Sequence, residues 1–266
     1  MFDSLATDYN RYRPSLPDPV VQLLAATLDG VRAPKVVDLG AGTGQVALAL
    51  LPVLPADSRI DLVDRDAGML TTAIEVLRPE LGQRSAIAHV VAAEEFTPVV
   101  DGDQADLITI CRAFHWMDRP AVLAMADRVA APTAAVAVMG DGSLWTHEAD
   151  WTSALKDLIR SHLGPERRAG TTGAYKEAGR RYEDDLAQSP FSAVTEHRFP
   201  LTRMWTPDHV VGYLRSTSFA RQDLFTDHAR FEEQARDLLE AHAQDGLLSE
   251  ELDFTVLLAR RPGAVR

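Results

Sequence analysis

The stretch Val36-Val37-Asp38-Leu39-Gly40-Ala41-Gly42-Thr43-Gly44 joins a short apolar run to three closely spaced glycines. Residues 35–39 have the β-branched and apolar composition of a buried parallel strand, and the apolar residues 46–51 suit a packed helix. Glycine tolerates positive φ and lets a ligand approach the bare backbone. The stretch therefore predicts a strand, a ligand-binding turn and a helix.

The glycine spacing here is G-x-G-x-G, whereas dinucleotide dehydrogenases carry G-x-G-x-x-G. A second apolar strand, residues 60–63, is followed directly by Asp64. That acid lies about twenty residues beyond the last glycine, the interval at which a second-strand carboxylate meets ribose hydroxyls. Together the two features predict a site for a cofactor that contains a nucleoside.

Residues 36–44, with Val63-Asp64-Arg65-Asp66-Ala67-Gly68-Met69-Leu70, resemble the first two motifs of class I S-adenosylmethionine-dependent methyltransferases. The resemblance implies an α/β, Rossmann-like fold with helices on both faces of a mostly parallel seven-stranded sheet. Its strand order would be 3-2-1-4-5-7-6, with strand 7 antiparallel. The cofactor would be S-adenosyl-L-methionine, with the glycine loop at its methionine portion and Asp64 at its ribose.

Two further strands are expected at residues 86–91 and 106–110. The residues after the first of them resemble the family position that meets adenine, and Cys111 ends the second. The cofactor-binding residues implied in this core are Asp38, Gly40, Ala41, Gly42, Gly44, Asp64, Arg65, Met69, Ala93, Glu94 and Cys111.

Ala113-Phe114-His115-Trp116 follows the fourth strand and resembles a signature of small-molecule methyltransferases similar to trans-aconitate methyltransferase. Ligands of open α/β sheets lie at the carboxyl ends of strands, where the strand order reverses. His115 is therefore the candidate catalytic base, because histidine titrates in the useful range. The alternative is that His115 shapes the pocket without moving a proton.

The N-terminal residues 2–14 are rich in aromatic and basic side chains and resemble the Tyr-x-x-x-Arg-Pro opening of the same subgroup. The resemblance implies a lid over the cofactor built from Tyr9, Tyr12 and Arg13. Arg13 would pair with the methionine carboxylate through a charge-assisted contact. A surface-packed amphipathic helix turn is the alternative interpretation.

We expect four segments: an N-terminal lid and first helix at 1–34, a cofactor-binding core at 35–140, an inserted helical cap at 141–190, and the C-terminal part of the sheet at 191–266. Aromatic residues and helical apolar spacing mark the cap as the substrate-selecting part. The residues expected to contact the acceptor are Tyr9, His115, Trp116, Trp145, Trp151 and Tyr175.

The composition excludes several classes of function. A net charge of −12 over 266 residues opposes binding to nucleic-acid phosphates. One cysteine excludes an internal disulfide and a multi-cysteine zinc site, and it fits a reducing, cytoplasmic compartment. No apolar run approaches the ~18 to 20 residues of a membrane span. We expect no metal site, because residues 147–150 are best explained as a solvated helix start.

The sequence thus predicts methyl transfer from S-adenosylmethionine to a small molecule, either a secondary metabolite or a carboxylic acid. A homodimer is left open. One alternative is a protein that keeps this fold for a non-methylating or regulatory role, since its binding residues would look the same. The other is an NAD(P)-dependent dehydrogenase, which the glycine spacing disfavours.

Overall fold

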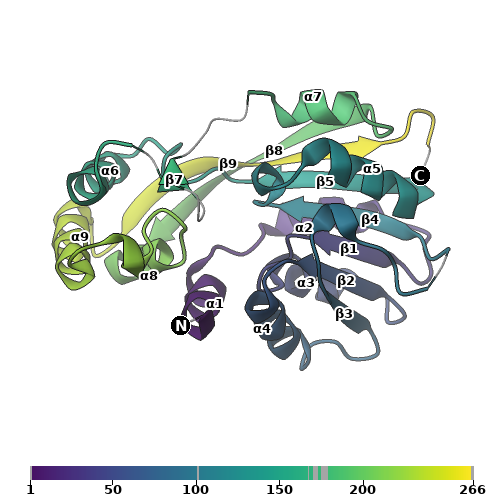
Figure 1. Ribbon diagram of the computed structural model, residues 1–266, viewed down its shortest axis with the longest axis horizontal. Helices are drawn as coiled ribbons and strands as arrows, with labels where there is room; N and C mark the ends of the chain where they lie inside the picture. The colour runs from purple at the N-terminus through teal and green to yellow at the C-terminus, as the bar shows by residue number, and fades with distance from the viewer. Residues whose placement is uncertain (1, 101, 167, 170–172, 175–178, 265–266) are drawn as a thin grey trace. The chain divides into compact units, whose positions relative to one another are not determined.

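The computed structural model describes residues 2–100, 102–166, 168–169, 173–174 and 179–264. The chain forms two compact units (Figure 1). The core unit consists of Ser15–Gly140, Ala178–Phe199 and Phe254–Arg266. The cap unit consists of Met1–Pro14, Asp141–Glu177 and Pro200–Asp253. The cap unit thus includes a C-terminal segment that the sequence analysis assigned to the sheet.

A seven-stranded sheet has the order β3-β2-β1-β4-β5-β9-β8. The first five strands pair in parallel, and β9 runs antiparallel to β5. Since β8 and β9 are the sixth and seventh strands of this sheet along the chain, the predicted order 3-2-1-4-5-7-6 is confirmed. The strands are β1 (Lys35–Leu39), β2 (Arg59–Asp64), β3 (Ser85–Val90), β4 (Ala105–Cys111), β5 (Ala130–Gly140), β8 (Ala193–Trp205) and β9 (Leu248–Arg260).

Helices of the core unit flank these strands (Figure 1). One face of the sheet shares a buried apolar cluster with α5 and with the short helix α7, which lies within residues 141–190 expected to form the helical cap. The helical segments of this unit are α2 (Asp18–Ala26), α3 (Gln45–Leu50), η1 (Leu51–Val53), α4 (Ala67–Leu77), η2 (Ala93–Glu95), η3 (Phe114–Trp116), α5 (Arg119–Val129) and α7 (Tyr182–Ala187).

The cap unit has its own apolar core, in which Trp151, Trp205 and Phe231 are almost fully buried. Its elements are α1 (Phe2–Tyr12), α6 (Asp150–Leu163), β6 (Arg168–Ala169), β7 (Gly173–Ala174), α8 (Pro207–Arg215), η4 (Gln222–Leu224) and α9 (His228–His242). Most of the N-terminal segment expected to form a lid is thus the helix α1, and its role over the cofactor stays a prediction. Among the described residues, no helix has the length and apolarity needed to span a membrane.

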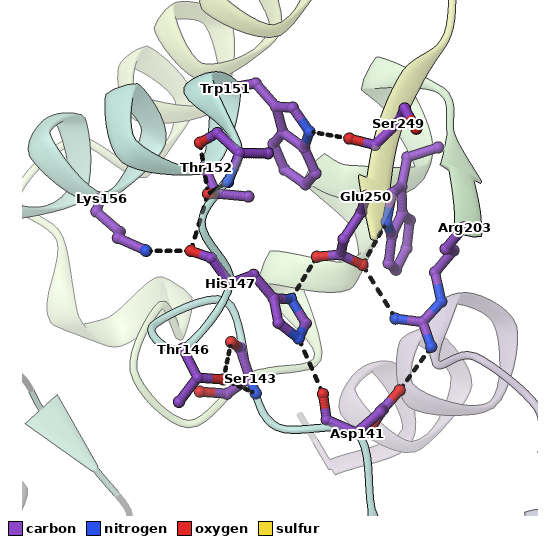
Figure 2. Close-up of polar contacts among 12 residues, drawn as sticks. Asp141, Ser143, Thr146, His147, Trp151, Thr152, Lys156, Arg203, Ser249 and Glu250 are labelled. Atoms are coloured by element: carbon purple, nitrogen blue, oxygen red, sulfur yellow. Dashed lines mark hydrogen bonds and ion pairs between the residues drawn. The ribbon is translucent and has the colours of Figure 1, made fainter. Parts of the chain in front are cut away.

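A network of buried charges lies in the cap unit (Figure 2). His147 Nδ1 pairs with Glu250 Oε1, and His147 Nε2 lies 2.9 Å from the carbonyl oxygen of Asp141. Arg203 donates one hydrogen bond to Glu250 Oε2 over 3.1 Å and another to Asp141 Oδ2 over 2.5 Å. The indole N–H of Trp205 also donates to Glu250 Oε2. These bonds tie the segment after β5 to β8 and β9.

On sequence grounds, residues 147–150 are expected to form a solvated helix start. Glu148 and Asp150 are indeed exposed where α6 begins, but the side chain of His147 is only 11% exposed and is ion-paired. Its partner Glu250 is distant in sequence, which is why the local pattern could not show this contact. The described residues contain no cluster of three or more side chains suited to hold a metal ion.

Candidate cofactor site

The glycine loop between β1 and α3 requires glycine for two separate reasons. Gly40, Gly42 and Gly44 have φ values of 68°, 53° and 79°, a region that side-chain-bearing residues rarely adopt. A Cβ on Gly40 would lie 2.5 Å from Ala113 Cβ, and one on Gly44 would lie 3.1 Å from Ala73 Cβ. The loop is therefore packed closely against both the turn that follows β4 and α4.

Asp64 connects the end of β2 to the glycine loop. Its Oδ2 accepts the backbone N–H of Gly42 over 2.9 Å, and its Oδ1 accepts the N–H of Asp66 over 2.9 Å. Both oxygens are thus oriented by the backbone, and each keeps further lone pairs for ribose hydroxyls. Asp66 in turn caps α4 by accepting from the N–H groups of Gly68 and Met69. Met69 therefore lies in the first turn of α4.

Three buried side-chain oxygens in this region have no hydrogen-bond partner among the described residues: Asp38 Oδ2, Thr43 Oγ1 and Glu94 Oε2. Leaving a buried polar atom unpaired costs about 1–3 kcal/mol, so three such oxygens in one region favour a polar ligand there. S-adenosylmethionine carries an ammonium group, hydroxyls and an adenine amine that could bind these oxygens. The residues of this site therefore fit the cofactor.

Thr43 is absent from the residues expected on sequence grounds. It lies between Gly42 and Gly44 and is only 1% exposed. Its place inside the glycine motif was a usable signal. The resemblance to the family implied Gly40, Ala41, Gly42 and Gly44 in this loop, but not the hydroxyl of Thr43.

Asp38 is the most perturbed acid of the core unit's site. The carboxyl is 1% exposed and accepts a 2.7 Å hydrogen bond from the hydroxyl of Thr109 on β4. Burial raises the pKa of Asp38 to about 7, the Thr109 hydrogen bond opposes this rise, and the charge of Asp64 adds to it. Asp38 is thus poised to lose its proton when a cation binds beside it.

Glu94 and Arg65 come together from the ends of two neighbouring strands. Arg65 follows β2, Glu94 lies in η2 just beyond β3, and Arg65 Nη2 is 2.6 Å from Glu94 Oε1. Arg65 is largely exposed, whereas Glu94 is mostly covered and its neighbour Ala93 is buried. The structure thus brings the two predicted cofactor-binding residues Arg65 and Glu94 into contact.

The turn after β4 carries the acceptor-side candidates. Cys111 is partly exposed and pairs in register with Met139, and the next residue, Arg112, has a φ of 54°. The N–H of Arg112 donates to the carbonyl of Met139 over 2.9 Å, which holds this rarely adopted backbone conformation. His115 and Trp116 are both exposed, with ring centroids 4.6 Å apart. The positive φ of Arg112 could not be predicted from the sequence, because residue type alone does not indicate this backbone conformation in a residue other than glycine.

The predicted lid residues lie in the cap unit. The guanidinium of Arg13 donates to the hydroxyl of Ser216 over 3.0 Å and to its carbonyl over 3.1 Å, and it lies 4.8 Å from the ring centroids of Tyr9 and Tyr213. The ring of Tyr12 packs edge-on to His209. These contacts join α1 to α8. A contact of Tyr12 and Arg13 with the cofactor stays a prediction.

The aromatic residues expected to meet the acceptor have different surroundings. Trp151 is 6% exposed in the apolar core of the cap unit, and its indole N–H donates to the carbonyl of Ser249 over 2.8 Å. Trp145 is partly buried against Phe219, with ring centroids 5.5 Å apart. Tyr175 lies outside the described residues. Core packing explains Trp151 without an acceptor.

Residues 36–133, which contain the cofactor-binding candidates of the core unit, match the model of a family described as a methyltransferase domain. The protein is an S-adenosylmethionine-dependent methyltransferase. Its sheet order and helices are those of the Rossmann-like class I methyltransferase fold. The match covers the glycine loop, the acid after β2 and the turn after β4.

Relatives of this methyltransferase agree with that assignment. An uncharacterised methyltransferase of Mycobacterium tuberculosis is 25% identical over 244 residues, which are 91% of this chain and 86% of the relative. A malonyl-[acyl-carrier protein] O-methyltransferase of Geobacter sulfurreducens is 33% identical over 163 residues, 58% of this chain and 57% of that protein. The YcgJ protein of Bacillus subtilis shares the fold with a TM-score of 0.55 and 17% identity, covering 93% of this chain and all of that one.

Proposed function

We propose that this methyltransferase transfers the methyl group of S-adenosylmethionine to a small-molecule acceptor, a carboxylic acid or a secondary metabolite, and that it belongs to the subgroup similar to trans-aconitate methyltransferase. The observation that carries the proposal is the close packing of Ala113 against Gly40. This packing brings the turn with His115 and Trp116 next to the loop that would hold the cofactor.

The proposed cofactor contacts follow from the chemistry of the side chains. Asp64 accepts hydrogen bonds from the ribose hydroxyls, and Asp38 accepts them from the ammonium group of the methionine portion. Glu94 accepts a hydrogen bond from the adenine amine. Thr43 offers a hydroxyl inside the glycine loop. The buried oxygens without partners at three of these residues support the assignment.

Methyl transfer from a sulfonium is an in-line displacement, in which the protein mainly binds and orients the two reactants. An acceptor hydroxyl must lose its proton, and His115 is the group that could take it. A carboxylic acid is already ionised near neutral pH, so its methylation needs no base. The role of His115 therefore depends on the acceptor class, as base in one case and as orienting group in the other.

The comparison with the Geobacter relative favours a carboxylic acid. That protein is named for methylation of a malonyl group carried on acyl-carrier protein, and malonyl groups end in a carboxylate. Since the match covers 58% of this chain, the acceptor itself remains a proposal.

The direct test is an incubation with S-adenosylmethionine and two matched sets of small molecules, carboxylic acids and alcohols, read by mass spectrometry. We expect a product heavier by one methylene group in one set. Release of no methylated product from either set, with tight cofactor binding, would favour the non-methylating alternative. Binding of NADH in place of S-adenosylmethionine would favour a dehydrogenase.

His115→Gln then separates the two acceptor classes. With a hydroxyl acceptor, the substitution should lower kcat by roughly 10² to 10⁴ and remove the pH inflection near the pKa of histidine. With a carboxylic acid acceptor, it should mainly raise the KM of the acceptor. His242→Gln, at an exposed helix end in the cap unit, is the matched control.

A further inference from the structure

Phe114 is the buried member of the turn that carries His115 and Trp116. Its side chain is 1% exposed, and its ring meets the ring of Tyr182 on α7 edge-on, with centroids 5.3 Å apart. The guanidinium of Arg119, in the first turn of α5, lies 4.5 Å from the Tyr182 centroid and 5.6 Å from that of Phe114. Edge-on ring pairs and cation–π contacts have preferred orientations, so this group of three constrains how Phe114 lies.

Arg119 is held in place by α7. Its Nη1 donates to Asp185 Oδ2 over 2.9 Å and to the carbonyl of Arg180 over 3.0 Å. The side chains of Arg119 and Asp185 are only 11% and 6% exposed. A buried ion pair fixes geometry more reliably than it adds stability, because desolvation offsets much of the attraction.

The packing of α7 against the sheet does not require the ion pair of Arg119 with Asp185. Leu186 of α7 and the nearby Phe191 are fully buried in the apolar cluster of the core unit and already pack α7 against it. The Arg119–Asp185 pair is therefore additional to the apolar packing of α7, whereas the Tyr182 ring both packs against the cluster and contacts Phe114. Their common neighbour is Phe114.

We propose that Arg119, Tyr182 and Asp185 are positioning residues for methyl transfer, which fix the orientation of His115 and Trp116 through the anchored ring of Phe114. The proposal rests on the proposed function of the turn after β4.

The reason is that His115 and Trp116 are exposed, so burial does not hold them. They belong to η3, a single turn of 3₁₀-helix that also contains Phe114. Because the three residues share one short turn, an anchored Phe114 constrains the backbone of η3 and so the directions in which the Cα–Cβ bonds of His115 and Trp116 point. Loosening that anchor should let the His115–Trp116 contact vary.

The test reads the His115–Trp116 contact by fluorescence and needs no acceptor. A protonated imidazole quenches a neighbouring indole, so the Trp116 emission should change as His115 titrates. The Trp116 signal is obtained as the difference between the wild-type protein and Trp116→Phe. His115→Gln should abolish the titration.

Tyr182→Leu should reduce the amplitude of this titration by more than half, because the ring between Phe114 and Arg119 is gone. Tyr182→Phe keeps the ring and should restore the amplitude. Asp185→Asn, which removes the partner charge of Arg119 with little change in shape, should reduce it as well. Glu183→Gln is the control on the same helix, since Glu183 pairs with the exposed side chain of Arg181.

Calorimetric binding of S-adenosylhomocysteine serves as the fold control, because the glycine loop and Asp64 are untouched. The proposal is overturned if Tyr182→Leu, or Asp185→Asn should the first variant not fold, binds that ligand normally and keeps the wild-type amplitude and midpoint. Once an acceptor is known, Tyr182→Leu should lower kcat by about tenfold with the KM of the cofactor unchanged. Failure to find any acceptor would count against the proposed function but not against the fluorescence result.

Discussion

The backbone N–H of Gly42 donates to Oδ2 of Asp64 over 2.9 Å, which joins the loop after β1 to the end of β2. The acid expected to hold the ribose is therefore also the acid that holds the glycine loop. Substitution of Asp64 should accordingly affect both the ligand contact and the shape of the loop.

Asp64→Ala is expected to weaken S-adenosylmethionine binding. Loss of charge-assisted hydrogen bonds typically costs about 1.5–3 kcal/mol, equivalent to roughly ten- to hundredfold in affinity. Asp64→Asn should lie in between, because one amide oxygen can still accept from Gly42. Titration calorimetry measures the affinities, with the exposed Asp57→Ala as control. Wild-type affinity in Asp64→Ala would remove the ribose assignment.

Cofactor affinity is expected to depend on pH through Asp38, whose pKa burial raises to about 7. Below that pH the carboxyl is largely protonated and attracts the ammonium group of the cofactor less. Affinity should therefore rise with pH up to about 7 and then level off, and binding should release protons. Calorimetry in buffers of different ionisation enthalpy measures this release. Asp38→Asn should bind more weakly and show no such dependence.

The same carboxyl should make the unliganded protein less stable as pH rises. Its pKa is 3.8 in the unfolded chain and about 7 in the fold, so the folded state binds more protons between these values. Ionisation of Asp38 thus opposes folding, so the contribution of Asp38 to the free energy of unfolding falls as the pH rises from 3.8 toward about 7. Across this pH range, the unfolding temperature of Asp38→Asn should fall less than that of the wild-type protein. An identical loss in both proteins would contradict the burial argument.

The buried pair of His147 and Glu250 in the cap unit should act in a different pH window. Burial alone would lower the pKa of His147, but hydrogen bonds to Glu250 and to the Asp141 carbonyl raise it above 6.5. Burial likewise opposes the ionised Glu250, yet His147, Trp205 and the Arg203 charge hold its pKa below 4.5. The stability contributed by charged His147 is fully present below pH 6.5 and is lost as the pH rises through the raised pKa of His147. The stability contributed by ionised Glu250 is present above pH 4.5 and is lost as the pH falls through the lowered pKa of Glu250.

His147→Gln should therefore unfold at a lower temperature than the wild type near pH 6, where the histidine is charged in the fold. The difference should shrink as pH rises above the raised pKa of His147. Thermal unfolding followed by circular dichroism measures it. The exposed His242→Gln is the control, and a difference that grows with pH would refute the expectation.

The attachment of α1 to α8 can be tested at Gly212. A Cβ at this position would lie 2.5 Å from the ring of Tyr12, so Gly212→Ala should displace that ring even though alanine favours the helix. Hydrogen exchange of residues 2–12 should become faster. Gly179→Ala, where a Cβ would have no heavy atom within 4 Å, is the matched control. Unchanged exchange in Gly212→Ala would show that Tyr12 is not needed to hold α1.

The cofactor half of the site was largely predictable because it depends on local sequence. Gly40, Gly42 and Gly44 need positive φ, and Asp64 follows a strand at a fixed interval, so spacing alone indicated both. The structure adds contacts between residues far apart in sequence. Thr109 on β4 donates to Asp38 on the neighbouring strand β1, and Arg65 after β2 pairs with Glu94 beyond β3.

The sequence by itself indicated the central strands, the glycine loop and a cofactor that contains a nucleoside, because apolar strand runs, closely spaced glycines and a strand-end acid are local properties. The order of the sheet and S-adenosylmethionine as the cofactor followed from the resemblance to a known family. The tertiary structure alone decided which aromatic and charged side chains are buried and which meet. Trp151 lies in the apolar core of the cap unit, and His147 pairs with Glu250. Of the residues on α7, Tyr182 contacts Phe114 in the turn after β4 and Asp185 pairs with Arg119 in α5. Such contacts form between residues that are distant along the chain and meet only when the chain packs. A short sequence motif therefore cannot predict them.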